Sequence, residues 1–227
     1  KAGAVKTALD YVDTPYVAFL DADGTYPPSE LNKLLVHAAK YDEVIGKRSY
    51  RNVSFVHRFG NVLINRLFSL IFAVDVGDVL SGMYILHTDV AKKLYLASKR
   101  FEIEIEIAAQ IAKLGKITYV PISYEKRYGK RKLSTFKDGF KIISYLIKLA
   151  SEYNPIFFYS MLISIFMIPG ILMLGYTGIE YVIRGIFHSG YALIGIALLL
   201  IGVQGFFTLG LSSMVKRLEY ELSRLKN

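Results

Sequence analysis

The 227-residue chain contains no cysteine, so it forms neither disulfide bonds nor thiolate metal sites. Its four histidines share no metal-ligand spacing, and we interpret them as structural residues. The sequence also lacks internal repeats and low-complexity linkers. These absences exclude disulfide-stabilised scaffolds, repeat architectures and metal sites built on cysteine or histidine.

Charged residues are absent from two long stretches, 155–176 and 190–214, although 21% of the whole chain is charged. About 20 apolar residues suffice to cross a bilayer core as a helix, so each stretch is long enough to span a membrane. The connection between them, residues 178–189, carries only Glu180 and Arg184 as charges. We therefore predict a two-helix transmembrane hairpin. The alternative, a pair of buried core helices, is disfavoured because so small a chain offers no partner large enough to bury them.

Basic residues cluster on both sides of this hairpin, whereas the connection between its helices contains only Arg184. The clusters comprise Lys126, Arg127, Lys130, Arg131, Lys132, Lys137, Lys141 and Lys148 before it, and Lys216, Arg217, Arg224 and Lys226 after it. Because lysine and arginine concentrate in cytoplasmic loops, we predict a multi-pass protein of the cell membrane with both flanks in the cytoplasm. The net charge of +9 suits a lipid bilayer with anionic headgroups and phosphate-bearing ligands. Nucleic acid is a poorer match, because the basic cluster adjoins the predicted anchor.

Upstream of the hairpin, short β-prone runs alternate with helical patterns, which predicts an α/β domain with parallel strand pairs. The chain opens within a helical pattern, whereas doubly wound nucleotide-binding sheets have further strands before such a point, so we expect about 60–90 residues to precede Lys1. We divide the chain into the C-terminal part of an α/β domain (1–133), an interfacial helix (134–152), the hairpin (153–214, with spans at 155–176 and 190–214) and a cytoplasmic tail (215–227).

The predicted interfacial helix has an apolar stripe at helical spacing, with lysines beside it. The stripe consists of Phe136, Phe140, Ile143, Ile147 and Ala150. A basic amphipathic helix directly before a membrane span is typical of a helix that lies in the plane of the membrane interface. A helix of the soluble core is the alternative.

Asp21 and Asp23 directly follow the apolar run 16–20, whose five residues are typical of a buried strand. In open α/β sheets, ligands bind beyond the carboxyl ends of the strands. Two carboxylates one residue apart at such a place are unfavourable unless a positive charge lies between them. A hard divalent cation that bridges to phosphates is the natural candidate. The alternative is an acidic turn or helix cap exposed to solvent.

Several motifs then match one family in the right order. They are KAGAVKTAL (1–9), FLDADGTYPPSEL (19–31), IGKR (45–48), DVLSGMY (78–84), FEIEIE (101–106) and VPISYEKRYGKRKLS (120–134). Together they resemble family 2 glycosyltransferases, and more narrowly the group of dolichol-phosphate mannose synthases and polyprenyl-phosphate glycosyltransferases. The resemblance implies a GT-A-like (Rossmann-like) mixed sheet that lacks its N-terminal segment, followed by the interfacial helix and the transmembrane hairpin.

The resemblance also implies roles for particular residues. Asp21 and Asp23 would hold a divalent cation, Mg²⁺ or Mn²⁺, at the diphosphate of a nucleotide-sugar donor, where the cation acts as a Lewis acid. Arg48 and Arg127 would join them as catalytic residues by clamping phosphate, since a guanidinium binds phosphate through two hydrogen bonds. The further substrate-binding residues implied are Thr25, Asp78, Ser81, Gly82 and Lys132.

Plainer interpretations of these residues stay open. The arginines could form a solvated basic face attracted to lipid headgroups, and Asp78 could be a turn residue. Glu104 and Glu106 could lie on a solvated helix face. The sequence also departs from the group in three places: Thr25 replaces a glutamine, Tyr84 an arginine and Arg131 a serine. These departures concern the sugar and the acceptor geometry rather than the class of enzyme.

The residues and the resemblance together predict an inverting glycosyltransferase. It would move a hexose, mannose or glucose, from GDP-mannose or UDP-glucose to dolichyl or polyprenyl phosphate at the cytoplasmic membrane face. A lipid phosphate is already an anion at neutral pH, so it needs cationic clamps rather than a strong base. The alternatives are a membrane glycosyltransferase with another acceptor, such as a polysaccharide synthase, and a non-enzymatic membrane-anchored scaffold. The sequence allows a homo-oligomer without specifying one.

Overall fold

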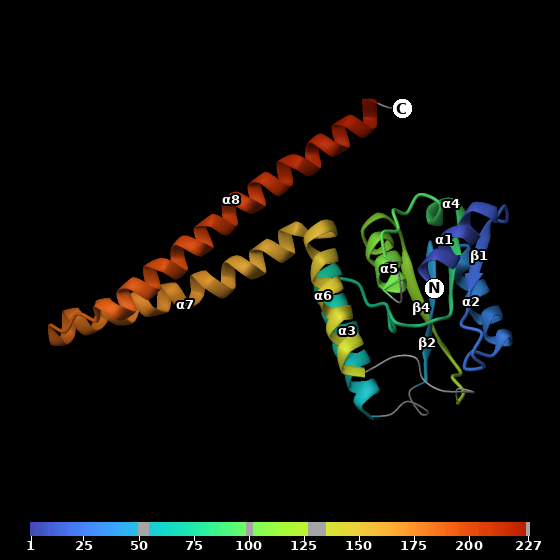
Figure 1. Cartoon of the computed structure of the whole chain (residues 1–227), viewed down its shortest axis with the longest axis horizontal. Helices are drawn as coiled ribbons and strands as arrows, with labels where there is room; N and C mark the ends of the chain where they lie inside the picture. The colour runs from blue at the N-terminus through green and yellow to red at the C-terminus, as the bar shows by residue number, and fades with distance from the viewer. Residues whose placement is uncertain (50–54, 99–101, 127–134, 226–227) are drawn as a thin grey trace. The chain divides into compact units, whose positions relative to one another are not determined.

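The computed structural model describes residues 1–49, 55–98, 102–126 and 135–225 (Figure 1). The chain divides into two compact units, Lys1–Leu149 and Ala150–Asn227. Two of the predicted site residues, Arg127 and Lys132, lie outside the described residues.

The first unit contains a mixed four-stranded sheet of β1 (Tyr16–Phe19), β2 (Glu43–Arg48), β3 (Tyr84–His87) and β4 (Ile117–Ile122), in the order β1-β3-β2-β4. Strands β2 and β4 run parallel, as the sequence predicts, but β3 runs antiparallel to both β1 and β2. The start of β3 therefore lies beside the ends of β1 and β2. This reversal brings the segments after β1, at the end of β2 and before β3 to one edge of the sheet.

Helices cover both faces of this sheet. Because side chains alternate along a strand, the register pair Val44 and Ile85 shares one face, where α2 (Leu31–Ala38) packs through Leu34. The short 3₁₀ helix η1 (Pro28–Glu30) leads into α2, and α1 (Ala2–Tyr11) opens the chain. Glu43 and Tyr84 lie on the opposite face, toward α5 (Ile103–Leu114). Figure 1 shows α2 and α5 on opposite sides of the strands.

Two further helices belong to this unit, α3 (Phe55–Phe72) and the short α4 (Thr88–Ala91). Helix α3 buries Ile64, Phe68 and Ile71, and its Asn65 holds the loop before β3. The Asn65 side chain accepts a hydrogen bond from Val79 N at 2.8 Å and donates one to Gly77 O at 3.3 Å. This loop carries Asp78.

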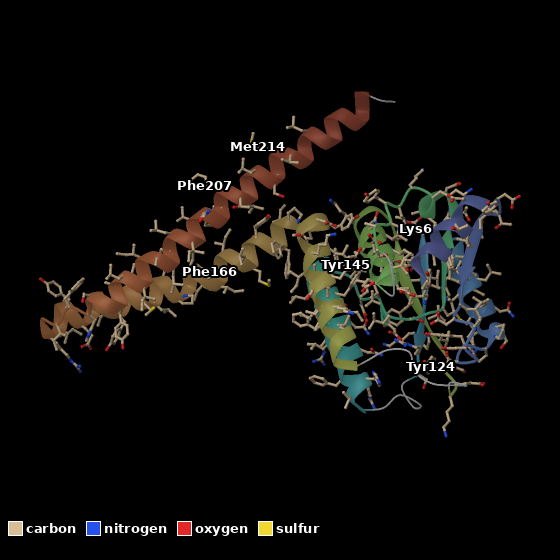
Figure 2. All side chains as sticks on the ribbon, viewed as in Figure 1. Lys6, Tyr124, Tyr145, Phe166, Phe207 and Met214 are labelled. Carbon is tan, nitrogen blue, oxygen red and sulfur yellow. The ribbon has the colours of Figure 1, made fainter. Side chains whose placement is uncertain are left out.

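Helix α6 (Thr135–Tyr153) connects the two units. Leu146 and Leu149 are buried, and the Tyr145 hydroxyl donates a 2.9 Å hydrogen bond to Glu106 Oε1 (Figure 2). Phe140 and Ile147, which belong to the predicted apolar stripe, are exposed. The helix thus packs on the α/β unit and also presents an apolar side outward.

The second unit is a helical hairpin of α7 (Pro155–Arg184) and α8 (Ser189–Leu225). Both helices are long and apolar enough to cross a membrane, and only 11% and 17% of their apolar windows are buried. So little burial within the hairpin disfavours the alternative of two soluble-core helices. The connection is shorter than the predicted 178–189, because α7 continues to Gly185, where a φ of +69° ends it. Glu180 and Arg184 do not interrupt the helix, since they pair at 3.3 Å one turn apart.

Candidate active site

The acidic motif lies at the edge of the sheet where β1 ends and β3 begins. Asp21 follows β1 and faces the backbone of Gly82, just before β3. A Cβ atom on Gly82 would lie only 2.6 Å from Asp21 Cγ, so the carboxylate occupies space that only glycine leaves open. The Asp21 side chain remains 39% exposed, and its Oδ1 lies 2.7 Å from Lys1 Nζ.

The Asp23 carboxylate is oriented by hydrogen bonds within its own loop. Its Oδ1 accepts hydrogen bonds from the Thr25 hydroxyl at 2.5 Å and from Thr25 N at 3.1 Å. Because Thr25 is also buried, its hydroxyl is directed toward Asp23 and not toward solvent. The structure thus gives Thr25 a role in orienting the second carboxylate, and its predicted contact with substrate stays a prediction.

Arg48 and Asp78 form a buried ion pair at the end of β2. Arg48 Nε donates to Asp78 Oδ2 at 2.6 Å and Nη2 donates to Oδ1 at 2.8 Å. The side chains are 12% and 0% exposed, which excludes a solvated basic face for Arg48 and a mere surface turn for Asp78. The guanidinium also lies 5.6 Å from the ring centre of Tyr124. Two contacts at fixed geometry orient the guanidinium.

Tyr26 joins these groups and was not predicted as a site residue. Its hydroxyl accepts a 2.7 Å hydrogen bond from Gly82 N. Burial raises the pKa of Tyr26 to about 12, although Arg48 lowers it, so the hydroxyl is neutral at physiological pH. The one available signal was an aromatic residue three positions after Asp23. Ser81, a predicted substrate contact, is buried, and its hydroxyl donates to Gly46 O at 2.6 Å.

A second acidic cluster lies behind the motif. Glu104 and Glu106 are 7% and 2% exposed, so the interpretation of a solvated helix face is wrong for both. Glu106 accepts hydrogen bonds from Ala97 N and Ser98 N at 2.8 and 3.0 Å, which ties the preceding loop to α5. Glu104 forms an ion pair with Lys1.

Lys1 stays charged in this environment. Burial alone would lower the pKa of Lys1, but the carboxylates of Glu104 and Asp21 together raise it. Glu104 has a raised pKa, because its desolvation outweighs the attraction of Lys1. Lys1 and Glu104 lie next to the acidic motif, and no local sequence pattern indicates their contact.

The site fits a metal that is shared with a ligand. In the described parts of the chain, no cluster of three or more His, Cys, Asp or Glu residues could hold a metal ion by itself. Mg²⁺ usually binds through one or two carboxylates together with substrate phosphates, and it retains several waters. The two carboxylates at this edge of the sheet suit such a shared cation.

Comparisons with known proteins identify the family. Residues 1–92 match the profile of glycosyl transferase family 2. The chain is 34% identical over 213 residues to the Haloferax volcanii protein named glycosyltransferase AglJ, covering 90% of this chain and 70% of that protein. The chain belongs to glycosyl transferase family 2. A second relative from the same organism, named dolichyl-phosphate hexose transferase, is 30% identical over 154 residues, covering 66% of this chain and 67% of the relative.

Solved structures agree on the fold of this glycosyltransferase. Glucosyl-3-phosphoglycerate synthase from Mycobacterium tuberculosis, solved with Mn²⁺, uridine diphosphate and phosphoglyceric acid, matches with a TM-score of 0.53 at 17% identity. The match covers 66% of this chain and 54% of the synthase, so this chain spans about half the length of that protein. At this identity the likeness shows the GT-A-like fold alone.

Replacing Gly82 with alanine is expected to weaken Mn²⁺ binding and glycosyl transfer by about 10²-fold while leaving the fold intact, because small displacements of a reacting group have effects of this size. The new Cβ would collide with the end of the Asp21 side chain, which can rotate away. Mn²⁺ titration followed by electron paramagnetic resonance measures the effect. The control is Gly60→Ala on α3, where a Cβ meets nothing within 4 Å. Wild-type Mn²⁺ binding by Gly82→Ala would contradict the prediction.

Glu43 makes stability depend on pH. Burial, reinforced by Glu104, raises the pKa of Glu43 well above its ordinary value of 4.5, and Glu43 Oε2 has no hydrogen-bond partner. A raised carboxyl pKa means that the folded state binds the extra proton. Its stabilising contribution is therefore present below pH 4.5 and is lost as the pH rises toward the folded pKa, by about 1.4 kcal/mol per pH unit.

We therefore expect Glu43→Gln to make unfolding less sensitive to pH above about 4.5, and to be more stable than the wild type at pH 8. Urea unfolding of the full chain in detergent at several pH values measures this. Glu125→Gln, at an exposed glutamate, serves as the control. An undiminished pH slope in Glu43→Gln would contradict the assignment.

Proposed function

We propose that this glycosyltransferase moves a hexose, mannose or glucose, from GDP-mannose or UDP-glucose to dolichyl or polyprenyl phosphate, with inversion at the anomeric carbon. The main support is one juxtaposition at the edge of the sheet. The carboxylate pair Asp21 and Asp23 shares this edge with Arg48, a buried and oriented arginine, in a chain that also has two membrane-length helices. The name of the dolichyl-phosphate hexose transferase relative agrees with a lipid-phosphate acceptor.

The residues of the site have distinct roles in this proposal. Asp21 and Asp23 hold Mg²⁺ or Mn²⁺, which when bound neutralises charge on the leaving diphosphate. Asp78 fixes Arg48 through Nε and Nη2, so that Nη1 is the nitrogen with which Arg48 binds the acceptor phosphate. The acceptor oxygen is already anionic, so none of these residues has to remove a proton from it. Arg127 and Lys132 add positive charge for the same phosphate.

The membrane elements bring the acceptor to this site. Helices α7 and α8 cross the bilayer as a hairpin, with the basic flanks and the catalytic unit on the cytoplasmic side. Helix α6 lies at the interface with the exposed Phe140 and Ile147 toward the lipid and Lys141 and Lys148 near the headgroups. The phosphate of a polyprenyl lipid lies at the depth of those headgroups. Transfer therefore takes place at the membrane surface.

The test is donor-dependent transfer onto radiolabelled polyprenyl phosphate by the full chain in detergent or liposomes. We expect one nucleotide-sugar to give a glycosylated lipid in the presence of Mn²⁺ or Mg²⁺, and nuclear magnetic resonance of the product to show the inverted anomer. Sugar polymer in place of glycolipid would indicate a polysaccharide synthase. Failure with every common nucleotide-sugar would overturn the proposal.

A further inference from the structure

Lys1 provides a positive charge at the place where a metal would bind. Its ammonium lies 2.7 Å from Asp21 Oδ1 and forms a second ion pair with the buried Glu104. The Lys1 side chain is 22% exposed and the Glu104 side chain 8%, so Glu104 holds the ammonium from the protein interior. The other Asp21 oxygen, Oδ2, lies against Gly82. One carboxylate of the acidic pair is therefore already partly neutralised.

This arrangement has an electrostatic consequence for cation binding. A divalent cation at Asp21 would lie close to the Lys1 ammonium, and the two like charges would repel each other. A diphosphate that arrives with the cation changes the balance, because it is attracted by both. Lys1 therefore opposes the cation alone and favours the cation with a diphosphate.

We infer that Lys1, held by Glu104, couples the binding of the divalent cation to the binding of the donor diphosphate. Glu104 is a positioning residue in this device, since it holds the Lys1 ammonium beside Asp21. Among the described residues, Lys1 is the cation paired with Glu104. The inference rests on Asp21 being a cation ligand, as proposed above.

Direct Mn²⁺ binding to the full chain, followed by electron paramagnetic resonance with and without GDP or UDP, tests the inference. Lys1→Met is expected to bind Mn²⁺ alone about tenfold more tightly than the wild type, within the usual range of coupling between sites. It is also expected to bind the nucleoside diphosphate more weakly. Glu104→Gln is expected to shift Mn²⁺ affinity the opposite way, because Lys1 then pairs with Asp21 alone. A purely structural role would weaken Mn²⁺ binding in both variants.

Two further variants make the result decisive. Lys1→Met leaves Glu104 buried without its cation, so the double variant Lys1→Met/Glu104→Gln, which removes both partners of this ion pair, is expected to fold and still bind Mn²⁺ more tightly than the wild type. Lys6→Met is the control. Lys6 lies on α1, which begins directly after Lys1, but lines a separate groove, so its replacement should leave Mn²⁺ binding unchanged. Mn²⁺ binding by Lys1→Met no tighter than that of the wild type would overturn the inference. Unchanged Mn²⁺ binding by Asp21→Asn would instead overturn the cation site itself.

Discussion

Replacement of Arg48 by methionine is expected to lower the free energy of unfolding of the α/β unit by about 3–5 kcal/mol. The reason is that the substitution leaves the Asp78 carboxylate buried without a partner. Asp78 is fully buried and receives two short hydrogen bonds from the guanidinium, at 2.6 and 2.8 Å. Without Arg48, this carboxylate must either keep an uncompensated charge in the interior or take up a proton. Both alternatives are costly.

Thermal unfolding of the full chain in detergent, followed by the near-ultraviolet circular dichroism of its tyrosines, measures the loss as a midpoint lower by about 10 °C. The matched control is Lys33→Gln, which breaks the ion pair between Lys33 and Glu30 at 2.7 Å. Lys33 is 53% exposed, and the largely buried Glu30 keeps its hydrogen bonds from Ser123, so this change should matter by less than about 1 kcal/mol. The double variant Arg48→Met/Asp78→Asn leaves no buried charge and should recover much of the loss. Equal midpoints for Arg48→Met and Lys33→Gln would show that the buried pair contributes no more than a pair whose lysine is exposed to solvent.

Replacement of Asp21 or Asp23 by asparagine is expected to reduce metal-dependent transfer by about 10³-fold, the rate equivalent of the several kcal/mol that a Lewis-acid cation supplies. Asparagine keeps the size of the side chain and one oxygen ligand but removes the charge. Asp21→Asn should also release Lys1 from one of its two ion pairs. Asp23→Asn should keep the bond from the Thr25 hydroxyl, because the amide oxygen can still accept it.

Initial rates of lipid glycosylation over a series of Mn²⁺ concentrations measure this effect. Asp13→Asn is the control, because it removes an exposed carboxylate from the loop before β1 and should leave the rate unchanged. Full activity of Asp21→Asn at low Mn²⁺ would remove that residue from the cation site. A reduced rate that high Mn²⁺ restores would place the defect in cation binding rather than in folding.

The sequence predicts the parts of this molecule that depend on local pattern. The strand before Asp21, the strand ending at Arg48 and the two long apolar helices are visible because apolar runs and their ends are local features. The reversal of β3 is not visible, since the antiparallel pairing of Tyr84 with Phe19 is a contact between distant segments. The close approach of Gly82 to Asp21 follows from that reversal, so the sequence does not predict this contact either.

The same limit explains the missed site residues. Lys1 appears in the sequence as one residue of an N-terminal helix, and Glu104 as one of several acidic residues in an alternating run. Only the packing of α5 under the sheet places Glu104 beside Lys1, and only the position of β1 places Asp21 on the other side. The resemblance to family 2 glycosyltransferases pointed to the motif residues, whereas partners that act between motifs required the fold.

The central place of β3 has a consequence for how the protein folds. This strand follows β1 and β2 in the chain but is inserted between them, so neither has its neighbour on that side until residues 84–87 are in place. Pairings between distant segments form slowly, because the chain loses loop entropy before the contacts stabilise it. Asp21, Arg48 and Gly82 are therefore expected to come together only when β3 is inserted, and chains without that pairing would carry strand edges open to aggregation.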